Sequence, residues 1–247
     1  MTILSVVTDV CMANGINPPV SMFGASIQPR TQAELLSLAN EMAQRIAYDV
    51  REWRVLKATH VFVGDGVADV NGVVTGTEAH PLPANFKRML LTSQVYPSMS
   101  PRQPLRFVAD ADEWLSRRIN TYQDGCGEWM LMGDDMLIHP ILMGPVGTIP
   151  AQRVTFTYLD KNCVKLFGGG YGSQFVNDGD EFRLDERLLK LGMVWQWKAN
   201  KGSPYAEDMG TYSDALVNIA GADTPAPIIV ERGGGWGRVA NASILQQ

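Results

Sequence analysis

The sequence is poor in the residues from which metal sites, disulfides and basic surfaces are built. Its 247 residues include only three cysteines and three histidines, and 21 basic residues face 26 acidic ones, for a formal net charge of -5. Nucleic-acid binding draws on clustered Lys and Arg, so this charge balance argues against it. The cysteines lie too far apart for a metal or redox motif. We therefore expect Cys11, Cys126 and Cys163 to be buried, reduced thiols.

Long apolar runs are also lacking. The longest are far shorter than the ~20 residues that a membrane-spanning helix needs. The first residues, Met-Thr-Ile-Leu-Ser-Val-Val-Thr-Asp, lack the basic start of a signal peptide. We expect a protein with no membrane partner that is not exported by the usual route.

No stretch of the sequence forms a recognisable ligand or catalytic motif. Residues 168–172 are rich in glycine but lack the Lys-Ser/Thr of a phosphate-binding loop, which favours a turn. Asp65, Asp69 and Asn71 supply oxygen atoms without the spacing of a calcium loop. His60, His80 and His139 belong to no zinc or triad motif. We expect no cofactor and no metal site.

Helical periodicity marks both ends of the chain. The apolar stripe of residues 2–14 predicts a first helix that ends before Gly15. A second helix is predicted from Thr31, where Thr31 and Glu34 have capping-box spacing, to near Trp53. Near the other end, two helices within residues 182–216 are joined by residues 201–204. In that turn we expect Gly202 to stop one helix, Ser203 to cap the next and Pro204 to begin it.

The middle of the chain has the composition of strands and turns. Residues 60–63 and 72–74 predict a hairpin, and residues 84–91 a short helical turn. A further strand is expected at 105–108 and a helix capped by Asp110 at 110–119. Paired strands are expected at 129–132 and 136–139, and alternation makes 153–159 the clearest strand.

These elements predict an α+β fold that is mainly α. The N- and C-terminal helices would form a four-helix-type bundle (residues 1–54 and 182–222), with a β-rich lobe inserted at 55–181 and an extended tail at 223–247. The helices of 182–216 would supply apolar side chains to the bundle core or to a subunit interface. These are Leu188, Leu191, Trp195, Trp197, Tyr205, Met209, Tyr212 and Leu216.

Three blocks of sequence carry a resemblance to a known family. The first is Asn-Gly-Ile-Asn-Pro-Pro-Val-Ser at 14–21, followed by Gln-Ala-Glu-Leu-Leu-Ser-Leu-Ala-Asn at 32–40. The second joins residues 53–62 to Pro-Leu-Pro-Ala-Asn-Phe-Lys-Arg-Met at 81–89. The third and most specific is residues 182–216. Together they resemble the head-to-tail adaptor, or tail accessory, proteins of short-tailed and related tailed bacteriophages.

The resemblance implies a structural virion protein at the head-tail junction, made in the host cytoplasm, and not an enzyme. Such proteins form a ring of about twelve neighbouring copies below the portal protein, with heterologous contacts between subunits. The ring extends the DNA channel, which DNA crosses without sequence-specific binding, and carries the tail nozzle or other tail proteins. Tails of similar proteins reach the portal, which makes portal-contact candidates of Pro225, Pro227, Ile228, Ile229, Val230 and Trp236.

A second hypothesis is a virion-associated peptidoglycan hydrolase, an activity attributed to some proteins of this kind. It requires two carboxyl groups about 5–10 Å apart across a cleft. Glu78, Glu113 and Glu128 are candidate acids that the sequence does not rank. Asp134 and Asp135 with Asp178, Asp180 and Glu181 are read as solvated turn acids. A third hypothesis is an interaction module for a host protein, which would show no affinity for a portal.

Overall fold

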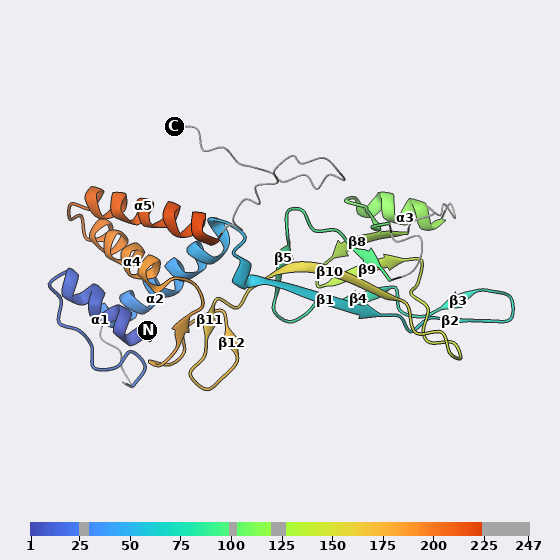
Figure 1. The fold of residues 1–247 in the computed structure, drawn as a ribbon, viewed down its shortest axis with the longest axis horizontal. Helices are drawn as coiled ribbons and strands as arrows, with labels where there is room; N and C mark the ends of the chain where they lie inside the picture. Colours follow the sequence, from blue (N-terminus) through green and yellow to red (C-terminus); the bar gives the residue numbers. More distant parts are fainter. Residues whose placement is uncertain (25–29, 99–102, 120–126, 224–247) are drawn as a thin grey trace, which may run out of the picture. The chain divides into compact units, whose positions relative to one another are not determined.

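The computed structural model describes residues 1–24, 30–98, 103–119 and 127–223, which belong to two compact units (Figure 1). The helical unit comprises Met1–Trp53 and the chain from Phe175 onward, and the β lobe comprises Arg54–Gln174. The sequence had placed the second boundary at 181/182, whereas the units divide at 174/175. The predicted start of the tail, Asp223, is the last residue of a helix.

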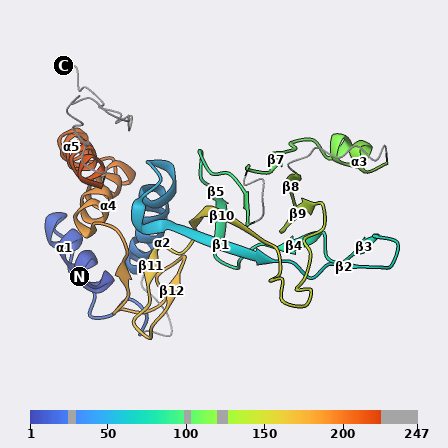
Figure 2. The same cartoon turned by 45° about the vertical axis from the view of Figure 1, so that its right-hand side comes forward.

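Four α-helices build the helical unit. They are α1 (Ile3–Ala13), α2 (Arg30–Gln44), α4 (Glu186–Asn200) and α5 (Ala206–Asp223). Helix α4 is the central element, since it contacts α1, α2 and α5. Figures 1 and 2 show α5 lying along α4 on the side away from α1. The N-terminal and C-terminal parts of the chain therefore share one core.

Local signals explain where these helices begin and end. In α1, buried side chains recur with helical spacing, and Thr2 caps the first turn by accepting a hydrogen bond from the Ser5 amide. Asp185 caps α4 by accepting from the amides of Arg187 and Leu188. Gly202 follows α4 with a φ of +69°, a conformation that favours glycine. The predicted role of Gly202 is confirmed.

Two helix ends differ from the prediction. Helix α2 gives way at Gln44 to a π-helical turn, Arg45–Asp49, instead of continuing to Trp53. The Trp53 indole N–H donates to the Ile46 carbonyl at 2.6 Å, which satisfies a backbone group within this widened turn. Helix α5 begins only at Ala206, so neither Ser203 nor Pro204 starts it.

One sheet of the β lobe is built on a long-range strand pair. Strand β1 (Lys57–Val63) runs antiparallel to β10 (Arg153–Asp160) along its whole length. Strands β5 (Phe86–Met89) and β6 (Tyr96–Pro97) pair with β10 as well. The prediction that residues 60–63 form a hairpin with 72–74 is therefore wrong, and the predicted helical turn at 84–91 contains a strand.

A second sheet carries the remaining helix. Its strand order is β4 (Ala79–Pro81), β9 (Asp135–His139), β8 (Glu128–Met132) and β7 (Arg106–Phe107), with β7 parallel to β8. Helix α3 (Ala111–Ile119) lies between β7 and β8 in the chain and begins after Asp110, whose carboxylate accepts from the Asp112 amide. The predicted β8–β9 pair and the Asp110 cap are confirmed.

Both sheets contribute to one apolar core in the β lobe. Side chains of β1 and β10 meet those of β8 and β9, among them Phe62, Phe156, Trp129 and Ile138. The other elements are short: the 3-10 turn Arg54–Leu56 and the strands β2 (Val67–Ala68), β3 (Val74–Thr75), β11 (Val164–Lys165), β12 (Tyr171–Gly172) and β13 (Glu181–Phe182).

The prediction of a mainly α four-helix-type bundle is wrong. The described residues form five α-helices and thirteen strands in four sheets, and they are 37% helical and 25% strand. The reason is physical. Strands such as β5 and β6 are short and pair with β10, which is distant in the sequence. Neither periodicity nor a local turn therefore predicts them. In the part of the chain that the structure describes, no helix is both long enough and apolar enough to cross a membrane.

Candidate functional site

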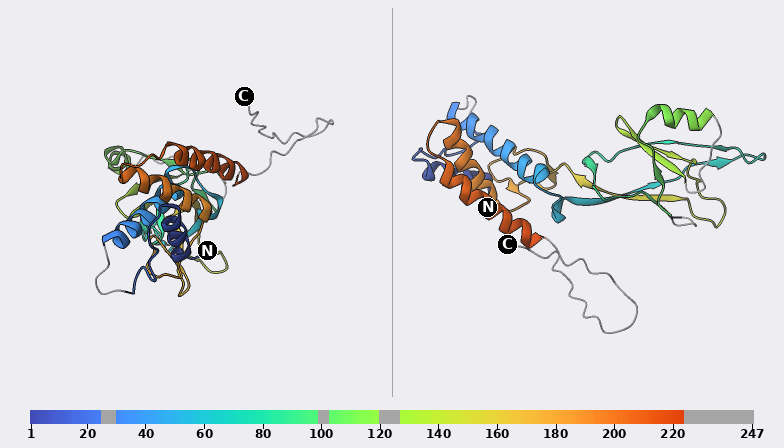
Figure 3. Two further views of the ribbon diagram at one scale, coloured as in Figure 1. Left: turned by 90° about the vertical axis from the view of Figure 1, so that its left-hand side faces the viewer. Right: turned by 90° about the horizontal axis from the view of Figure 1, so that it is seen from above.

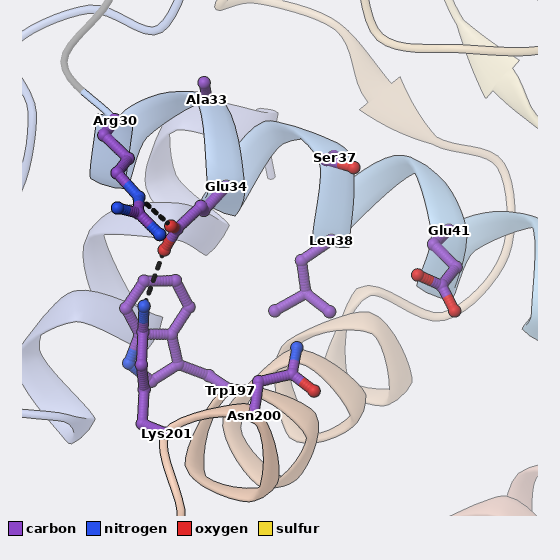
Figure 4. Close-up of a pocket in the computed structure, with 9 residues that line it drawn as sticks. All are labelled: Arg30, Ala33, Glu34, Ser37, Leu38, Glu41, Trp197, Asn200 and Lys201. Carbon is purple, nitrogen blue, oxygen red and sulfur yellow. Dashed lines mark hydrogen bonds and ion pairs between the residues drawn. The ribbon is translucent and has the colours of Figure 1, made fainter.

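A groove of about 630 Å³ lies between α2 and α4 in the helical unit. Side chains three and four residues apart on α2 form one wall: Arg30, Ala33, Glu34, Ser37, Leu38 and Glu41. Trp197, Asn200 and Lys201, at the end of α4, form the other wall (Figure 4). Leu38 and Trp197 are buried, while Ala33 and Ser37 are exposed. Helical ridges at this spacing make a surface onto which another helix can pack.

One end of this groove is cationic. The Glu34 carboxylate accepts from Lys201 Nζ at 2.6 Å and from Arg30 Nε at 2.8 Å. These hydrogen bonds, that of Lys201 first, lower the pKa of Glu34. The Lys201 ammonium also lies 4.6 Å from the centre of the Trp197 ring, a cation–π contact. Two cations thus share a single carboxylate, which leaves one positive charge in excess.

The eight side chains that the sequence assigned to a core or an interface all lie on α4, α5 and the turn between them. Leu188 and Trp197 are buried, and Leu191, Trp195, Tyr212 and Leu216 are partly buried. Tyr205 and Met209 lie at the surface, with 41% and 45% of their area exposed. The Trp195 ring lies 6.1 Å from Tyr212 and 6.4 Å from Tyr205, measured between centroids.

Helix α5 is mostly exposed in the single chain. Of its 18 residues only Ala215 is fully buried, and Val217 is 71% exposed. Figure 3 shows the helix along the outside of the helical unit. The apolar side chains of Met209 and Val217 therefore lie on the surface of the single chain.

The structure brings the three candidate glutamates of the hydrolase hypothesis to one region of the β lobe, beside α3. Glu128, on β8, is 3% exposed and pairs with Arg117, which also binds Glu113 at 2.7 Å. Each of these two carboxylates therefore has a guanidinium partner, which the buried charge of Glu128 requires.

The third glutamate has cationic neighbours of its own. Glu78 lies 3.0 Å from Arg118 Nε and 3.6 Å from His139 Nδ1. The nearby His139 imidazole, together with the charge of Arg118, lowers the pKa of Glu78. A general acid of a glycoside hydrolase needs a raised pKa. The pKa of Glu78 is therefore shifted in the direction opposite to the one that a general acid needs.

The acidic side chains of the loop that follows β1 accept hydrogen bonds from backbone amides of the same loop. Asp69 accepts from the amides of Asn71 and Val73, both at 2.8 Å, and Asp65 binds the Thr77 amide at 2.9 Å and the Thr77 hydroxyl. The Thr77 hydrogen bonds lower the pKa of Asp65. Within the described residues, no group of three or more His, Cys, Asp or Glu could hold a metal ion.

Two of the three cysteines are buried free thiols, as the sequence predicts: Cys11 and Cys163. Burial raises the pKa of Cys11, which keeps it in the thiol form. Cys126 lies outside the described residues. The portal-contact candidates Pro225, Pro227, Ile228, Ile229, Val230 and Trp236 also lie outside them.

Sequence reasoning missed the groove between α2 and α4. The sequence predicts a capping box of Glu34 with Thr31, whereas the Glu34 carboxylate binds Arg30 and Lys201. The first of these contacts is an i,i+4 pair that the sequence shows. The second joins residues 167 apart and depends on how α2 packs against α4.

Comparison with known proteins adds no relative. No protein-family model matches the chain, and no curated protein matches its sequence.

Proposed function

We propose that the protein is a structural component of a tailed-bacteriophage virion, an adaptor that forms a ring between the portal and the tail. The proposal starts from the three sequence blocks that resemble the adaptor family. The first falls on the segment after α1 and on α2, the second on β1 and on β4 to β5, and the third on α4 and α5. The blocks thus coincide with the elements that build both units.

The observation that carries the proposal is the exposure of α5. This helix belongs to the most specific block, yet the single chain buries only Ala215 fully. Tyr205, Met209 and Val217 remain at the surface. In a ring each subunit contacts two neighbours through different surfaces. A long exposed helix with apolar side chains can supply one of these contact surfaces.

The hydrolase hypothesis gains no support from its candidate acids. Glu113 and Glu128 share Arg117, and the pKa of Glu78 is lowered. A turbidity assay on purified peptidoglycan provides the direct test of that hypothesis. We expect no clearing, and clearing that is lost in a Glu78→Gln variant would reverse this conclusion.

Electron microscopy of the purified chain mixed with the portal protein of the same virus tests the proposal. We expect a ring of the chain bound to one end of the portal. A portal that stays bare at a large excess of the chain would refute the adaptor function.

A further inference from the structure

Helix α5 displays two carboxylates that nothing in the described part of the chain neutralises. The acidic residues on its inner side are paired: Asp208 with Lys198 at 2.6 Å and Asp223 with Arg51 at 3.8 Å. Glu207 and Asp214 are exposed, and neither forms an ion pair with a described residue. They lie seven residues apart, two turns of helix, and therefore share the outer face of α5.

The groove between α2 and α4 carries the opposite charge at one end. Arg30 and Lys201 share the single carboxylate of Glu34 there. Glu41, two turns further along α2, lies 3.8 Å from Arg45. The Arg30 side chain is 92% exposed, so its guanidinium can take a second carboxylate without breaking the first contact. The exposed small side chains of Ala33 and Ser37 let a helix approach the floor of the groove closely.

The groove of one copy cannot hold the α5 of the same copy. Helix α5 packs on α4 through its other side, which includes Tyr212, Ala215 and Leu216, so Glu207 and Asp214 face away from that contact. The groove and the outer face of α5 share no residue. A contact between them is therefore heterologous, the kind that joins copies head to tail and gives a ring when the rotation between copies closes.

We infer that the outer face of α5 in one copy packs into the α2–α4 groove of a second copy of this chain, with Glu207 and Asp214 against Arg30 and Lys201. The inference rests on the proposed ring, for which it names the contact between neighbouring subunits. Charge complementarity selects the partner: an acidic helix face on one side, and two cations that share one acid on the other.

Charge reversal at each surface tests this contact in the full-length chain. One variant carries Arg30→Glu and Lys201→Glu, and the other carries Glu207→Lys and Asp214→Lys. Assembly on the portal is followed by electron microscopy and mass photometry, and circular dichroism checks the fold. At low salt, each variant alone should form rings only at a protein concentration at least about tenfold higher than the wild type needs. Added salt should reduce this difference in concentration.

Mixing the two variants in equal amounts is the decisive step. Every interface of an alternating ring then joins an acidic surface to a basic one, so assembly should return to within about threefold of the wild type. A matched control, Asp112→Lys with Asp134→Lys in the β lobe, reverses the same number of acids and should assemble normally. Two single variants that assemble as well as the wild type, or a mixture that does not recover, would overturn the inference. A wild-type chain that forms no ring would instead refute the adaptor function.

Discussion

His80 stacks on Phe62 inside the β lobe, with ring centroids 4.9 Å apart and ring planes 26° from parallel. His80 is only 6% exposed, and its Nε2 forms no hydrogen bond with any described residue. The His60 ring meets the same phenyl ring edge-on, also at 4.9 Å. Two imidazoles thus lie against one aromatic side chain, in surroundings that favour their neutral form.

The first prediction concerns pH. Burial lowers the pKa of both His60 and His80 in the folded chain, although the charge of Asp65 acts in the other direction on His80. The neutral imidazoles therefore contribute their full stability above the unfolded-state pKa of about 6.5. That stability is lost as the pH falls below it, because the unfolded chain takes up protons first. Urea unfolding at pH 7.5 and pH 5 should give a lower midpoint at pH 5.

A variant isolates the contribution of His80. His80→Phe keeps an aromatic ring against Phe62 but removes the titrating group, so the drop in midpoint between pH 7.5 and pH 5 should become smaller. Below about pH 4.5 the carboxylates begin to titrate, and both proteins should lose stability in parallel there. An unchanged drop between pH 7.5 and pH 5 would show that His80 does not sense pH.

The second prediction compares two helical glycines. A Cβ added to Gly192 on α4 would lie 2.5 Å from the Met42 methyl and 3.3 Å from the Tyr212 ring, whereas a Cβ on Gly210 of α5 would meet nothing within 4 Å. Gly210→Ala should stabilise the chain by about 0.5–1 kcal/mol through helix propensity. Gly192→Ala should be less stable than Gly210→Ala by about 1 kcal/mol, because the buried Met42 methyl and the Tyr212 ring must shift. Equal unfolding free energies would contradict the close packing of α4 on α2 and α5.

The third prediction concerns the end of α2. Trp53 is 3% exposed and donates to the Ile46 carbonyl in the π-helical turn. Trp53→Phe should cost about 1–3 kcal/mol, because a buried carbonyl loses its partner. Amide exchange in residues 45–49 should accelerate more than exchange in α1. Uniform acceleration throughout the helical unit would instead indicate a general loss of packing.

The sequence patterns predict the elements that are stabilised by interactions between neighbours in the sequence. The periodic stripes of α1, α4 and α5, the alternation of β10 and the Gly-Asp-Asp turn between β8 and β9 depend on neighbours in sequence. The pairing of β1 with β10 does not depend on such neighbours, because it joins residues as far apart in the sequence as Lys57 and Leu159. The same limit hid the α2–α4 groove and the charge pairs beside α3, because both arise only when distant segments pack together.

The fourth prediction concerns residues 224–247, the segment that holds all six portal-contact candidates. A chain that ends at Asp223 retains the ion pair of Asp223 with Arg51. Residues 224–247 include two prolines and four glycines, so they have little to add to a core. The truncated chain should unfold at the same urea concentration as the full chain but bind the portal at least about tenfold more weakly. Undiminished portal binding would exclude the segment as the anchor.

Cryo-electron microscopy of the full-length chain with the portal protein of the same virus tests whether this chain forms a ring on a portal. We expect a closed ring of about twelve copies, coaxial with the portal channel, in which α5 of each subunit contacts the α2–α4 groove of the next. A portal that remains bare at saturating concentrations of the chain, or a chain that binds there singly without ring contacts, would contradict this expectation.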